Sequence, residues 1–367
     1  MSRFDTVWPA DSIEFCPHPL ADNIFVCGTY KLDQPEDVPP PNDDGEDEDQ
    51  PLTPRIYHRR GKCMVFEVDD HNDYKLIREV DLPAVPDMKW CHRTDDVNPI
   101  LGVADSEGHI SLYDLDPESK HLNKIQSIEC APSTVLCLSL DWSNRRTPSS
   151  GLGSLIVSLS NGSLALLEPD STSELSISSQ WEAHEFEPWI AAWNYWDTNV
   201  IYSGGDDLKL KGWDIRSGFS QPTFVNKRFD AGVTTIQSHP YVEHIIAVGS
   251  YDNSVRLFDM RKPLVPLVQA DVGGGAWRVK WHPSSRRRKD LLVACMHDGF
   301  KVVRFNALGD PVVGGGVGGK EWDIVKRFDK HESLAYGVDW SFREQAKDES
   351  LIASCSFYDH LLHVWEG

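Results

Sequence analysis

Two side chains in the second half of the chain, His297 and Asp206, combine a proton-accepting group with a position at a tight turn. Each directly precedes an Asp in a turn that recurs along the chain. Because equivalent positions of a closed repeat lie on the same face, we expect these side chains to surround one central opening. Imidazole exchanges protons near neutral pH, so His297 is predicted as the general base and Asp206 as the alternative. The GxSxG nucleophile elbow is absent, and Cys295 and Cys355 lie inside strand patterns. A hydrolytic reaction at this opening would therefore use water as its nucleophile.

A second set of side chains could hold a cation at the same opening. Alignment of the repeats places three aromatic residues at the start of innermost strands and two directly before turn acids: Trp189, Trp277, Tyr336, Tyr251 and Tyr358. Aromatic faces around a carboxylate attract a quaternary ammonium group through cation–π interactions. The alternative is that Trp189, Trp277 and Tyr336 only pack between neighbouring units of the repeat.

Three cations are candidates for stabilising an oxyanion near these aromatic residues. They are Lys280, Arg278 and Lys301, which lie in the strands that flank the same turns. The alternative for each of them is an ordinary solvated side chain.

A repeated unit positions all of these residues, and it is clearest in the second half of the chain. Residues 201–216, 246–261 and 292–305 each read as a short apolar strand, a turn of Asp, Gly or Asn, and an alternating strand that closes on an aromatic residue. The units recur about every 45 residues, which is the period of a four-stranded propeller blade. The predicted fold class is therefore all-β, a WD-repeat β-propeller.

Seven blades can be placed along the chain. Their innermost strands are predicted at residues 12–15, 88–92, 135–142, 189–193, 233–238, 277–281 and 336–340. The sequence stops after the third strand of blade seven, so residues 3–8 are predicted to supply its outer strand and close the ring. Residues 1–367 then form a single propeller, with an acidic, Pro-rich, mobile insertion at 33–54 in blade one and a Gly-rich loop at 309–319 in blade six.

Two further histidines have a structural interpretation. His184 and His331 precede blades four and seven, where each is predicted to pair with a turn acid, Asp207 or Asp359. The alternative is a catalytic pair, although buried His–Asp networks are common structural features.

The composition narrows the classes of function. A formal net charge of −21 and a pI near 5.0 make direct binding of nucleic acid unfavourable. No apolar run is long enough to span a bilayer, and the N-terminus lacks the apolar core of a signal peptide. The eight cysteines are scattered without a CxxC pair, which predicts reduced thiols, no structural metal and a cytoplasmic location. We expect a monomer.

Several segments of the second half are more specific than generic propeller sequence. They span 204–216, 249–252, 277–283, 295–301, 331–340 and 355–360, and they include Cys-Met-His-Asp-Gly-Phe-Lys and Ser-Phe-Tyr-Asp-His. Together they resemble the WD-repeat diphthine methyltransferase family, strongly from residue 201 to the end and weakly before it. The acidic insertion is the main departure from that likeness.

The resemblance implies an activity. Despite the family name, its members are assigned as carboxylic ester hydrolases that remove the methyl ester of diphthine on translation elongation factor 2, releasing methanol, a late step of diphthamide biosynthesis. A separate ATP-dependent ligase then amidates the freed carboxylate. No cofactor is implied, and the implied partner is elongation factor 2 carrying methylated diphthine. The trimethylammonium group of that side chain fits the predicted aromatic cage. The resemblance supplies no catalytic motif, so the predicted roles of His297 and Asp206 rest on their positions.

The competing interpretation is a non-catalytic WD-repeat scaffold or a substrate receptor of a cullin ubiquitin ligase, because the propeller fold does not determine a function. Asp214-Ile-Arg216 and Asp259-Met-Arg261 resemble the paired Asp-x-Arg boxes of such receptors. These boxes would lie at the ends of third strands, away from the opening. RNA binding, a third class, is disfavoured by the negative charge.

Overall fold

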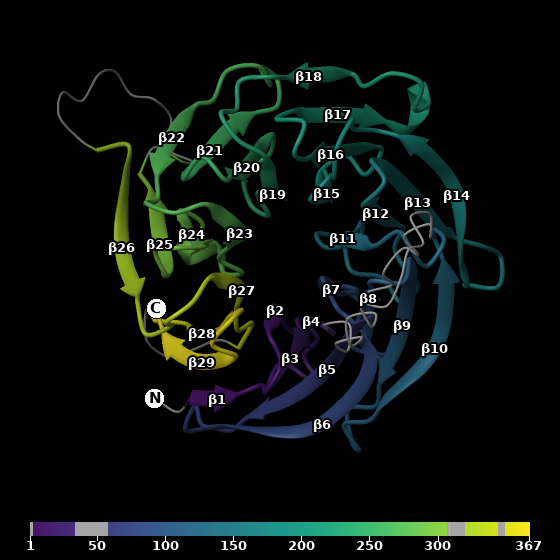
Figure 1. Cartoon of the computed structure of the whole chain (residues 1–367), viewed down its shortest axis with the longest axis vertical. Coiled ribbons are helices and arrows are strands. Elements are labelled where there is room, and N and C mark those ends of the chain that lie inside the picture. The colour runs from purple at the N-terminus through teal and green to yellow at the C-terminus, as the bar shows by residue number, and fades with distance from the viewer. Residues whose placement is uncertain (1–2, 34–57, 307, 309–319, 344–348) are drawn as a thin grey trace, which may run out of the picture.

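The computed structural model describes residues 3–33, 58–306, 308, 320–343 and 349–367. Within them, seven antiparallel sheets stand around a central channel and no α-helix occurs (Figure 1). The predicted all-β, seven-bladed propeller is therefore confirmed. Of the two predicted insertions, 309–319 and all of 33–54 except Asp33 lie outside the described residues. The described part of the chain contains no helix with the length and apolarity needed to cross a membrane.

Each blade runs from an inner strand at the channel to an outer strand at the rim. Blade one contains β2 (Ala10–Phe15), β3 (Ile24–Thr29), β5 (Arg59–Val68) and β6 (Tyr74–Pro83), with β4 (Lys31–Leu32) paired to β5. Blade two contains β7 (Asp87–Trp90), β8 (Ile100–Ala104), β9 (His109–Leu115) and β10 (Leu122–Glu129). Blade three contains β11 (Cys137–Trp142), β12 (Leu155–Leu159), β13 (Ser163–Pro169) and β14 (Leu175–Glu182).

The remaining blades follow the same order. Blade four contains β15 (Ile190–Trp193), β16 (Val200–Gly204), β17 (Leu210–Asp214) and β18 (Phe224–Asn226), with the short 3-10 helix η1 (Ile215–Ser217). Blade five contains β19 (Val233–Ser238), β20 (Ile245–Ser250), β21 (Ser254–Asp259) and β22 (Val268–Asp271). Blade six contains β23 (Ala276–Trp281), β24 (Asp290–Cys295), β25 (Phe300–Phe305) and β26 (Trp322–Phe328), with η2 (Ser285–Arg287). Blade seven contains β27 (Ala335–Trp340), β28 (Leu351–Ser356), β29 (Leu361–Glu366) and β1 (Arg3–Asp5).

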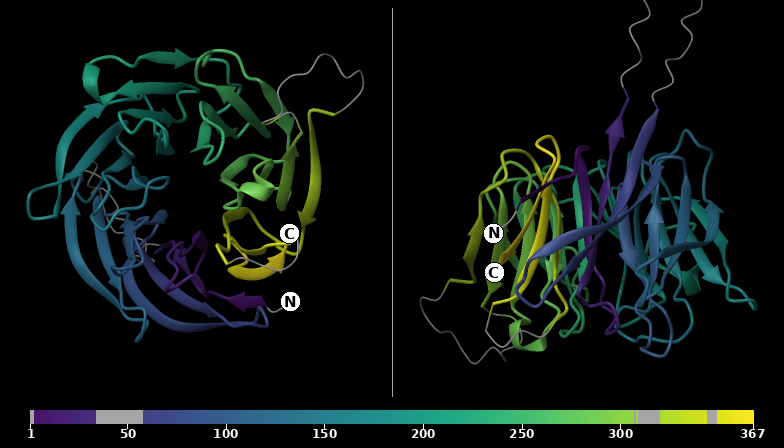
Figure 2. Two further views of the ribbon diagram at one scale, coloured as in Figure 1. Left: turned by 180° about the vertical axis from the view of Figure 1, so that it is seen from behind. Right: turned by 90° about the horizontal axis from the view of Figure 1, so that it is seen from below.

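The N-terminal strand closes the ring, as predicted. Strand β1 pairs antiparallel with β29, with Arg3 opposite His363 and Asp5 opposite Leu361. The Thr6 N–H continues the pairing by donating to the His360 carbonyl at 2.9 Å. The two ends of the chain therefore lie on neighbouring strands of one blade (Figure 2). This pairing joins the first and last elements of the described chain in one blade and so closes the ring.

Tryptophans tie neighbouring blades together at the channel. Five inner strands end on a buried tryptophan: Trp90, Trp142, Trp193, Trp281 and Trp340. Four of them donate the indole N–H to a main-chain carbonyl of the inner strand one blade earlier, at 3.2, 2.9, 3.0 and 2.9 Å: Trp90 to Glu14, Trp142 to Lys89, Trp193 to Asp141 and Trp340 to Lys280. Each bond satisfies a buried carbonyl that the sheet leaves free.

We predict that Trp142→Phe lowers the free energy of unfolding by about 1–2 kcal/mol, because it leaves the Lys89 carbonyl without its donor while keeping most of the burial. Denaturant unfolding followed by circular dichroism measures the change. Trp322→Phe on the rim strand β26 is the matched control. A loss in Trp142→Phe no larger than in that control would contradict a stabilising role for the bond.

The predicted pairing of His184 with Asp207 is confirmed. The His184 Nδ1 lies 2.8 Å from Asp207 Oδ1, and its Nε2 lies 2.7 Å from Ser203 Oγ, which also accepts from the Trp213 indole at 2.9 Å. Burial lowers the pKa of His184 despite the neighbouring carboxylate. All of its ring positions are occupied inside blade four, so the pair is structural.

The predicted direct pairing of His331 with Asp359 is wrong. The His331 ring bonds two serines instead, Ser356 at 2.5 Å and Ser354 at 2.9 Å, and Ser356 in turn bonds Asp359. The turn of blade seven is one residue longer than that of blade four, so the acid lies too far from the ring for a direct contact.

Candidate active site

A recurring main-chain hydrogen bond marks one mouth of the channel. In all seven blades, an N–H at the end of the second strand donates to the loop that leads into an inner strand; the donors are Tyr30, Ser106, Ser160, Asp206, Tyr251, Met296 and Phe357. A residue with positive φ follows two positions later in blades two to five, at Gly108, Gly162, Leu208 and Asn253, but three positions later in blades six and seven, at Gly299 and His360. The turns of blades six and seven therefore contain one additional residue.

This additional residue corrects the predicted register for His297 and Tyr358. We call the residue that donates the recurring hydrogen bond the mouth position. In blades two to five it directly precedes the turn acid, as Asp206 and Tyr251 do. In blades six and seven the residue before the turn acid lies one position after the mouth position. Met296 holds the position in blade six and packs against the aromatic residues there. His297 is exposed and makes no hydrogen bond or ring contact within the described part of the chain. Tyr358 is 68% exposed in the turn between β28 and β29. The role of His297 as a base stays a prediction.

Four of the predicted aromatic residues form one cluster at this mouth. We call Trp189, Tyr251, Trp277 and Tyr336 the aromatic cluster; they come from blades four, five, six and seven. Trp277 lies at its centre, with ring centroids 5.5 Å from Trp189, 6.0 Å from Tyr251 and 4.8 Å from Tyr336. Trp189 and Tyr251 are 6.5 Å apart and nearly perpendicular. The rings therefore touch one another, and all except Trp277, which is 8% exposed, are only partly buried.

The ring contacts continue beyond the cluster to residues that the sequence did not single out. Phe357 lies 5.0 Å from Tyr336, 6.3 Å from Tyr30 of blade one and 5.0 Å from Tyr358. Phe357 holds the mouth position of blade seven, and correct register alone would have identified it. Aromatic surface thus reaches from blade four to blade one, and Tyr358 forms its outer end.

Asp206 lies against the aromatic cluster. Burial raises the pKa of Asp206, while the Trp189 indole lowers it by a smaller amount. Gly232 makes room for this arrangement, because a Cβ there would overlap the Asp206 carboxylate and lie 3.2 Å from the Tyr251 ring. The structure therefore brings Asp206 together with two predicted site residues, Trp189 and Tyr251.

A second carboxyl group, Asp11, joins the cluster from blade one, and sequence reasoning missed it. The pairing of the inner strands shifts by one residue near their start in several blades, at Ala10–Ser12, Ala276–Arg278 and Ala335–Val338 among others. Such bulges re-aim the side chain of the extra residue. Asp11 occupies the bulge of β2, as Trp277 and Tyr336 occupy those of β23 and β27. Asp11 is 7% exposed.

Three buried polar atoms of the aromatic cluster and its carboxyl groups have no hydrogen-bond partner among the described residues. They are the indole nitrogens of Trp189 and Trp277 and the Oδ1 of Asp11. The two indoles lie close enough to Asp206 and Asp11 to lower the pKa of each, but short of a well-formed hydrogen bond. Unsatisfied groups of this kind are rare in folded proteins, and here they offer two donors and an acceptor to a ligand or water.

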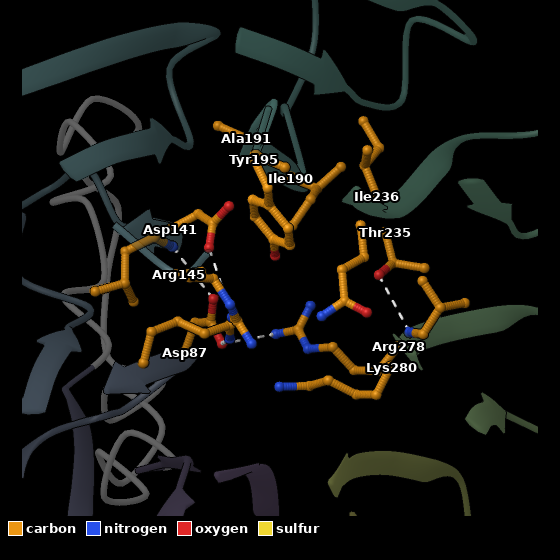
Figure 3. Close-up of a pocket in the computed structure, with 15 residues that line it drawn as sticks. Asp87, Asp141, Arg145, Ile190, Ala191, Tyr195, Thr235, Ile236, Arg278 and Lys280 are labelled. Carbon is orange, nitrogen blue, oxygen red and sulfur yellow. Dashed lines mark hydrogen bonds and ion pairs between the residues drawn. The ribbon is translucent and has the colours of Figure 1, made fainter. Parts of the chain in front are cut away.

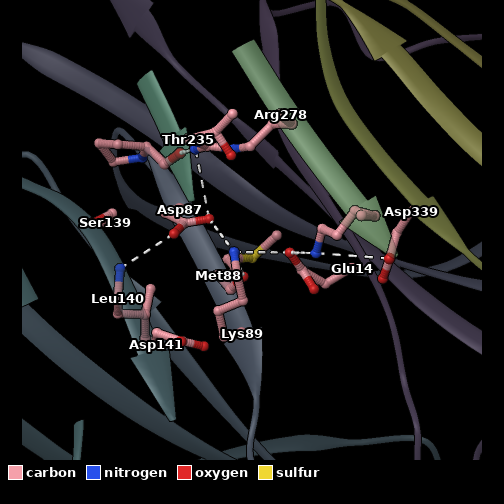
Figure 4. A network of polar contacts seen from close by, with 12 residues as sticks. Glu14, Asp87, Met88, Lys89, Ser139, Leu140, Asp141, Thr235, Arg278 and Asp339 are labelled. Carbon is pink, nitrogen blue, oxygen red and sulfur yellow. Dashed lines mark hydrogen bonds and ion pairs between the residues drawn. The ribbon is translucent and has the colours of Figure 1, made fainter. Parts of the chain in front are cut away.

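Lys280, predicted to bind substrate, lies deeper in the channel than the aromatic cluster. Charged side chains occupy the residue before the terminal aromatic of five inner strands: Glu14, Lys89, Asp141, Lys280 and Asp339. The Lys280 ammonium contacts Glu14 and lies 3.6 Å from Asp339. Lys89 lies 2.8 Å from the same Glu14 carboxylate (Figure 4). The structure therefore places Lys280 in a network of ion pairs across the channel.

Charged side chains line the channel interior. Arg145 of blade three and Arg278 and Lys280 of blade six point into it (Figure 3). One cavity beside them measures about 30 Å³, enough for only a few water molecules, and a second, lined by Arg145, Lys280 and Asp339 among others, measures about 200 Å³. Asp141 partners Arg145 at 3.6 Å and Asp87 partners Arg278 at the same distance. These charges line the channel below the mouth.

The other two predicted oxyanion cations differ in position. Arg278 lies beside the cluster, with its guanidinium 5.4 Å from the Trp277 ring and its Nη2 donating to the Pro86 carbonyl at 3.2 Å. The Lys301 ammonium instead bonds Asp298 and the Val272 carbonyl inside blade six. Arg278 is therefore the cation that the structure brings near the cluster.

No thiol of this chain is placed as a nucleophile. All eight cysteines are buried and unpaired. Burial raises the pKa of Cys295 to about 12 and that of Cys355 well above its usual range. The described residues contain no group of three or more His, Cys, Asp or Glu side chains arranged to hold a metal ion.

The two Asp-x-Arg boxes lie on the surface away from this mouth. Arg216 bonds Asp214 at 2.7 Å and Asp197 at 3.1 Å, and Arg261 bonds its own box acid, Asp259. Each arginine thus already pairs with carboxylates of its own blade, which reduces what it can offer a partner.

Comparison with known proteins gives related sequences over nearly the whole chain. The chain is 39% identical to "Diphthine methyltransferase" of Homo sapiens over 351 residues, which cover 93% of this chain and 74% of the human protein. It is 34% identical to "Diphthine methyltransferase homolog" of Dictyostelium discoideum, over 98% of this chain and 96% of that protein. It is 31% identical to "Diphthine methyltransferase" of Schizosaccharomyces pombe, over 98% and 95%. No family profile matches the chain.

Among solved structures, a chain of "Crystal Structure of Mitotic Checkpoint Complex" superposes with a TM-score of 0.67 over 100% of this chain and 91% of that one. The sequence identity is 16%, so this likeness shows the propeller fold alone.

Proposed function

This chain belongs to the diphthine methyltransferase family, and from that membership we propose that it hydrolyses the methyl ester of diphthine on translation elongation factor 2. Its role is in diphthamide biosynthesis. The reaction converts the ester to a carboxylate and releases methanol. We place it in the cytoplasm, together with this substrate. The non-catalytic scaffold or ligase receptor is not favoured.

One observation carries the proposal, namely the aromatic cluster with two carboxyl groups at one mouth of the channel. The diphthine side chain ends in a trimethylammonium group, which carries charge but no hydrogen-bond donor. The faces of Trp189, Tyr251, Trp277 and Tyr336 suit such a cation, and each favourable cation–π contact contributes about 0.5–2 kcal/mol. Asp206 adds a negative charge when ionised, and burial has already reduced its hydration.

The rim of this mouth suits a substrate that is carried on a protein. Exposed apolar side chains lie on the same face, on its loops and turns and in β4: Val7, Leu32, Phe186, Leu208 and Tyr358. Exposed apolar groups around a binding site are typical of protein contact surfaces. They support elongation factor 2 itself, rather than free diphthine, as the partner.

Mass spectrometry of elongation factor 2 tests the proposal. We expect incubation of methylated-diphthine elongation factor 2 with this protein to lower the mass of the elongation factor by one CH₂ unit. One methanol should be released for each molecule of elongation factor 2. A heat-denatured sample of the protein serves as the control. An unchanged mass together with a stable complex would overturn the esterase and support a scaffold.

A further inference from the structure

Asp11 is the one carboxyl group at this mouth that is both deeply buried and unpaired. Its residue is 7% exposed, and its Oδ1 has no hydrogen-bond partner in the described part of the chain. The β2 bulge turns it toward Trp277, the centre of the aromatic cluster. An unpaired buried carboxyl group destabilises a fold, so its presence among ligand-binding side chains needs a functional explanation.

We propose that Asp11 is the general base of the ester hydrolysis, and this inference rests on the proposed function. Asp206 and the aromatic cluster hold the trimethylammonium group, and Asp11 activates the attacking water. Arg278 and the free indole N–H of Trp277 are the neighbouring donors for the carbonyl oxygen. His297, on the additional residue of its turn, is exposed and outside this group.

The reaction needs only water and the ester. The water oxygen bonds to the carbonyl carbon while Asp11 takes one water proton, and the carbonyl π electrons move to oxygen as an oxyanion. When that electron pair returns, the carbon–methoxy bond breaks, and Asp11 gives the proton to the departing methoxide, which leaves as methanol. The other water proton is released to solvent by the product acid. Asp11 ends as it began, ionised.

The charges around Asp11 suit this role. The groups that act on it come from five blades: Arg278 of β23, Asp87 of β7, Tyr251, Tyr336 of β27, Tyr30 and Cys355 of β28. Burial raises the pKa of Asp11 to about 7, Arg278 opposes this, and Asp87 adds to it. A base with a pKa near the working pH transfers protons most effectively.

Steady-state kinetics of Asp11→Asn on methylated-diphthine elongation factor 2 test the inference. We expect kcat to fall about 100-fold or more, with KM little changed, because the amide cannot accept the proton. Asp206→Asn is the matched variant, and we expect it to raise KM more than it lowers kcat. In the wild type, kcat/KM should fall about tenfold for each pH unit below pH 7, and this limb should vanish in Asp11→Asn.

Folding can be separated from catalysis. The folded-state pKa of Asp11 is raised above its ordinary value, so its ionisation costs stability as the pH rises through 7. Asp11→Asn should therefore melt at or above the wild-type temperature at pH 8. If Asp11→Asn does not fold, the role of Asp11 is still tested by the wild-type pH profile and by recovery of the activity of Asp11→Ala on addition of formate.

The outcomes are distinct. A wild-type protein that releases no methanol overturns the proposed function. An active wild type whose Asp11→Asn variant keeps its rate and its acid limb overturns the role of Asp11 alone. If His297→Ala then removes that limb, the base is His297.

Discussion

Replacing Trp277 with leucine is expected to raise KM for methylated-diphthine elongation factor 2 by about 10- to 100-fold while kcat changes little. Trp277 touches the three other rings of the aromatic cluster, and leucine keeps an apolar side chain there without the π face. The predicted loss corresponds to about 1.4–2.8 kcal/mol of binding free energy, the range of one or two desolvated cation–π contacts.

A pair of inhibitors separates attraction to the cation from simple apolar contact. A ligand with a trimethylammonium group should bind the wild type more tightly than the neutral analogue with carbon in place of nitrogen, and Trp277→Leu should abolish this preference. Trp196→Leu is the control, because Trp196 follows the inner strand of blade four that Trp189 precedes, and therefore lies at its other end. Equal affinity of the wild type for both ligands would argue against a cation site.

The architecture was predictable because a propeller repeats the same physical problem seven times. Each unit alternates apolar and polar residues around a short turn, so one clear unit near residue 201 identifies the others by spacing. Ring closure followed from an unpaired third strand at one end of the chain and an unpartnered segment at the other, which pair as Arg3 with His363.

The site was predictable only where residue type and register agreed. In blades six and seven an aromatic residue, Trp277 or Tyr336, follows an alanine at the bulge of the inner strand. Ala10-Asp11 has the same position but carries an acid, so the predicted strand began one residue too late to include it. The predicted register of His297 was off by one residue, because a longer turn places Met296 at the mouth position instead.

The ion pairs across the channel could not be predicted from the sequence. The period shows that Glu14, Lys280 and Asp339 face the channel, but not which of them meet. Glu14 and Lys280 are 266 residues apart in the chain and become neighbours only when the ring closes. Lys280, which was predicted to stabilise an oxyanion, therefore forms ion pairs with carboxylates of two other blades.

Lys280→Met is expected to lower the free energy of unfolding by about 3–5 kcal/mol, because it leaves the buried Glu14 carboxylate without its main counter-charge. Lys280, Glu14 and Asp339 are all less than 5% exposed. Burial opposes ionisation of Glu14, but Lys280 and Lys89 outweigh it and hold the pKa of Glu14 at about 2. Without Lys280, Glu14 would keep Lys89 and the weaker effect of Arg145, and would take up a proton more readily.

The pH dependence of this loss follows from the sign of the shift. A carboxyl whose folded-state pKa is lowered stabilises the fold above its ordinary pKa, and this stabilisation disappears as the pH falls through the folded value. The wild type should therefore lose the Glu14 contribution between about pH 4.5 and pH 2. The stability difference between wild type and Lys280→Met should be full at pH 7 and shrink over that acidic range. Thermal unfolding at a series of pH values measures it.

Lys75→Met is the matched control for Lys280→Met. Lys75 also pairs with a glutamate, Glu67 at 3.1 Å, but its side chain is 71% exposed, so its loss should change the unfolding temperature little. If Lys280→Met instead melted like the wild type and lost only kcat, Lys280 would be reachable by the oxyanion and the channel would not be sealed by its ion pairs. A large loss of stability in Lys280→Met alone would show that the ring depends on charges shared between blades one, six and seven, which leaves stabilisation of the oxyanion to groups at the mouth.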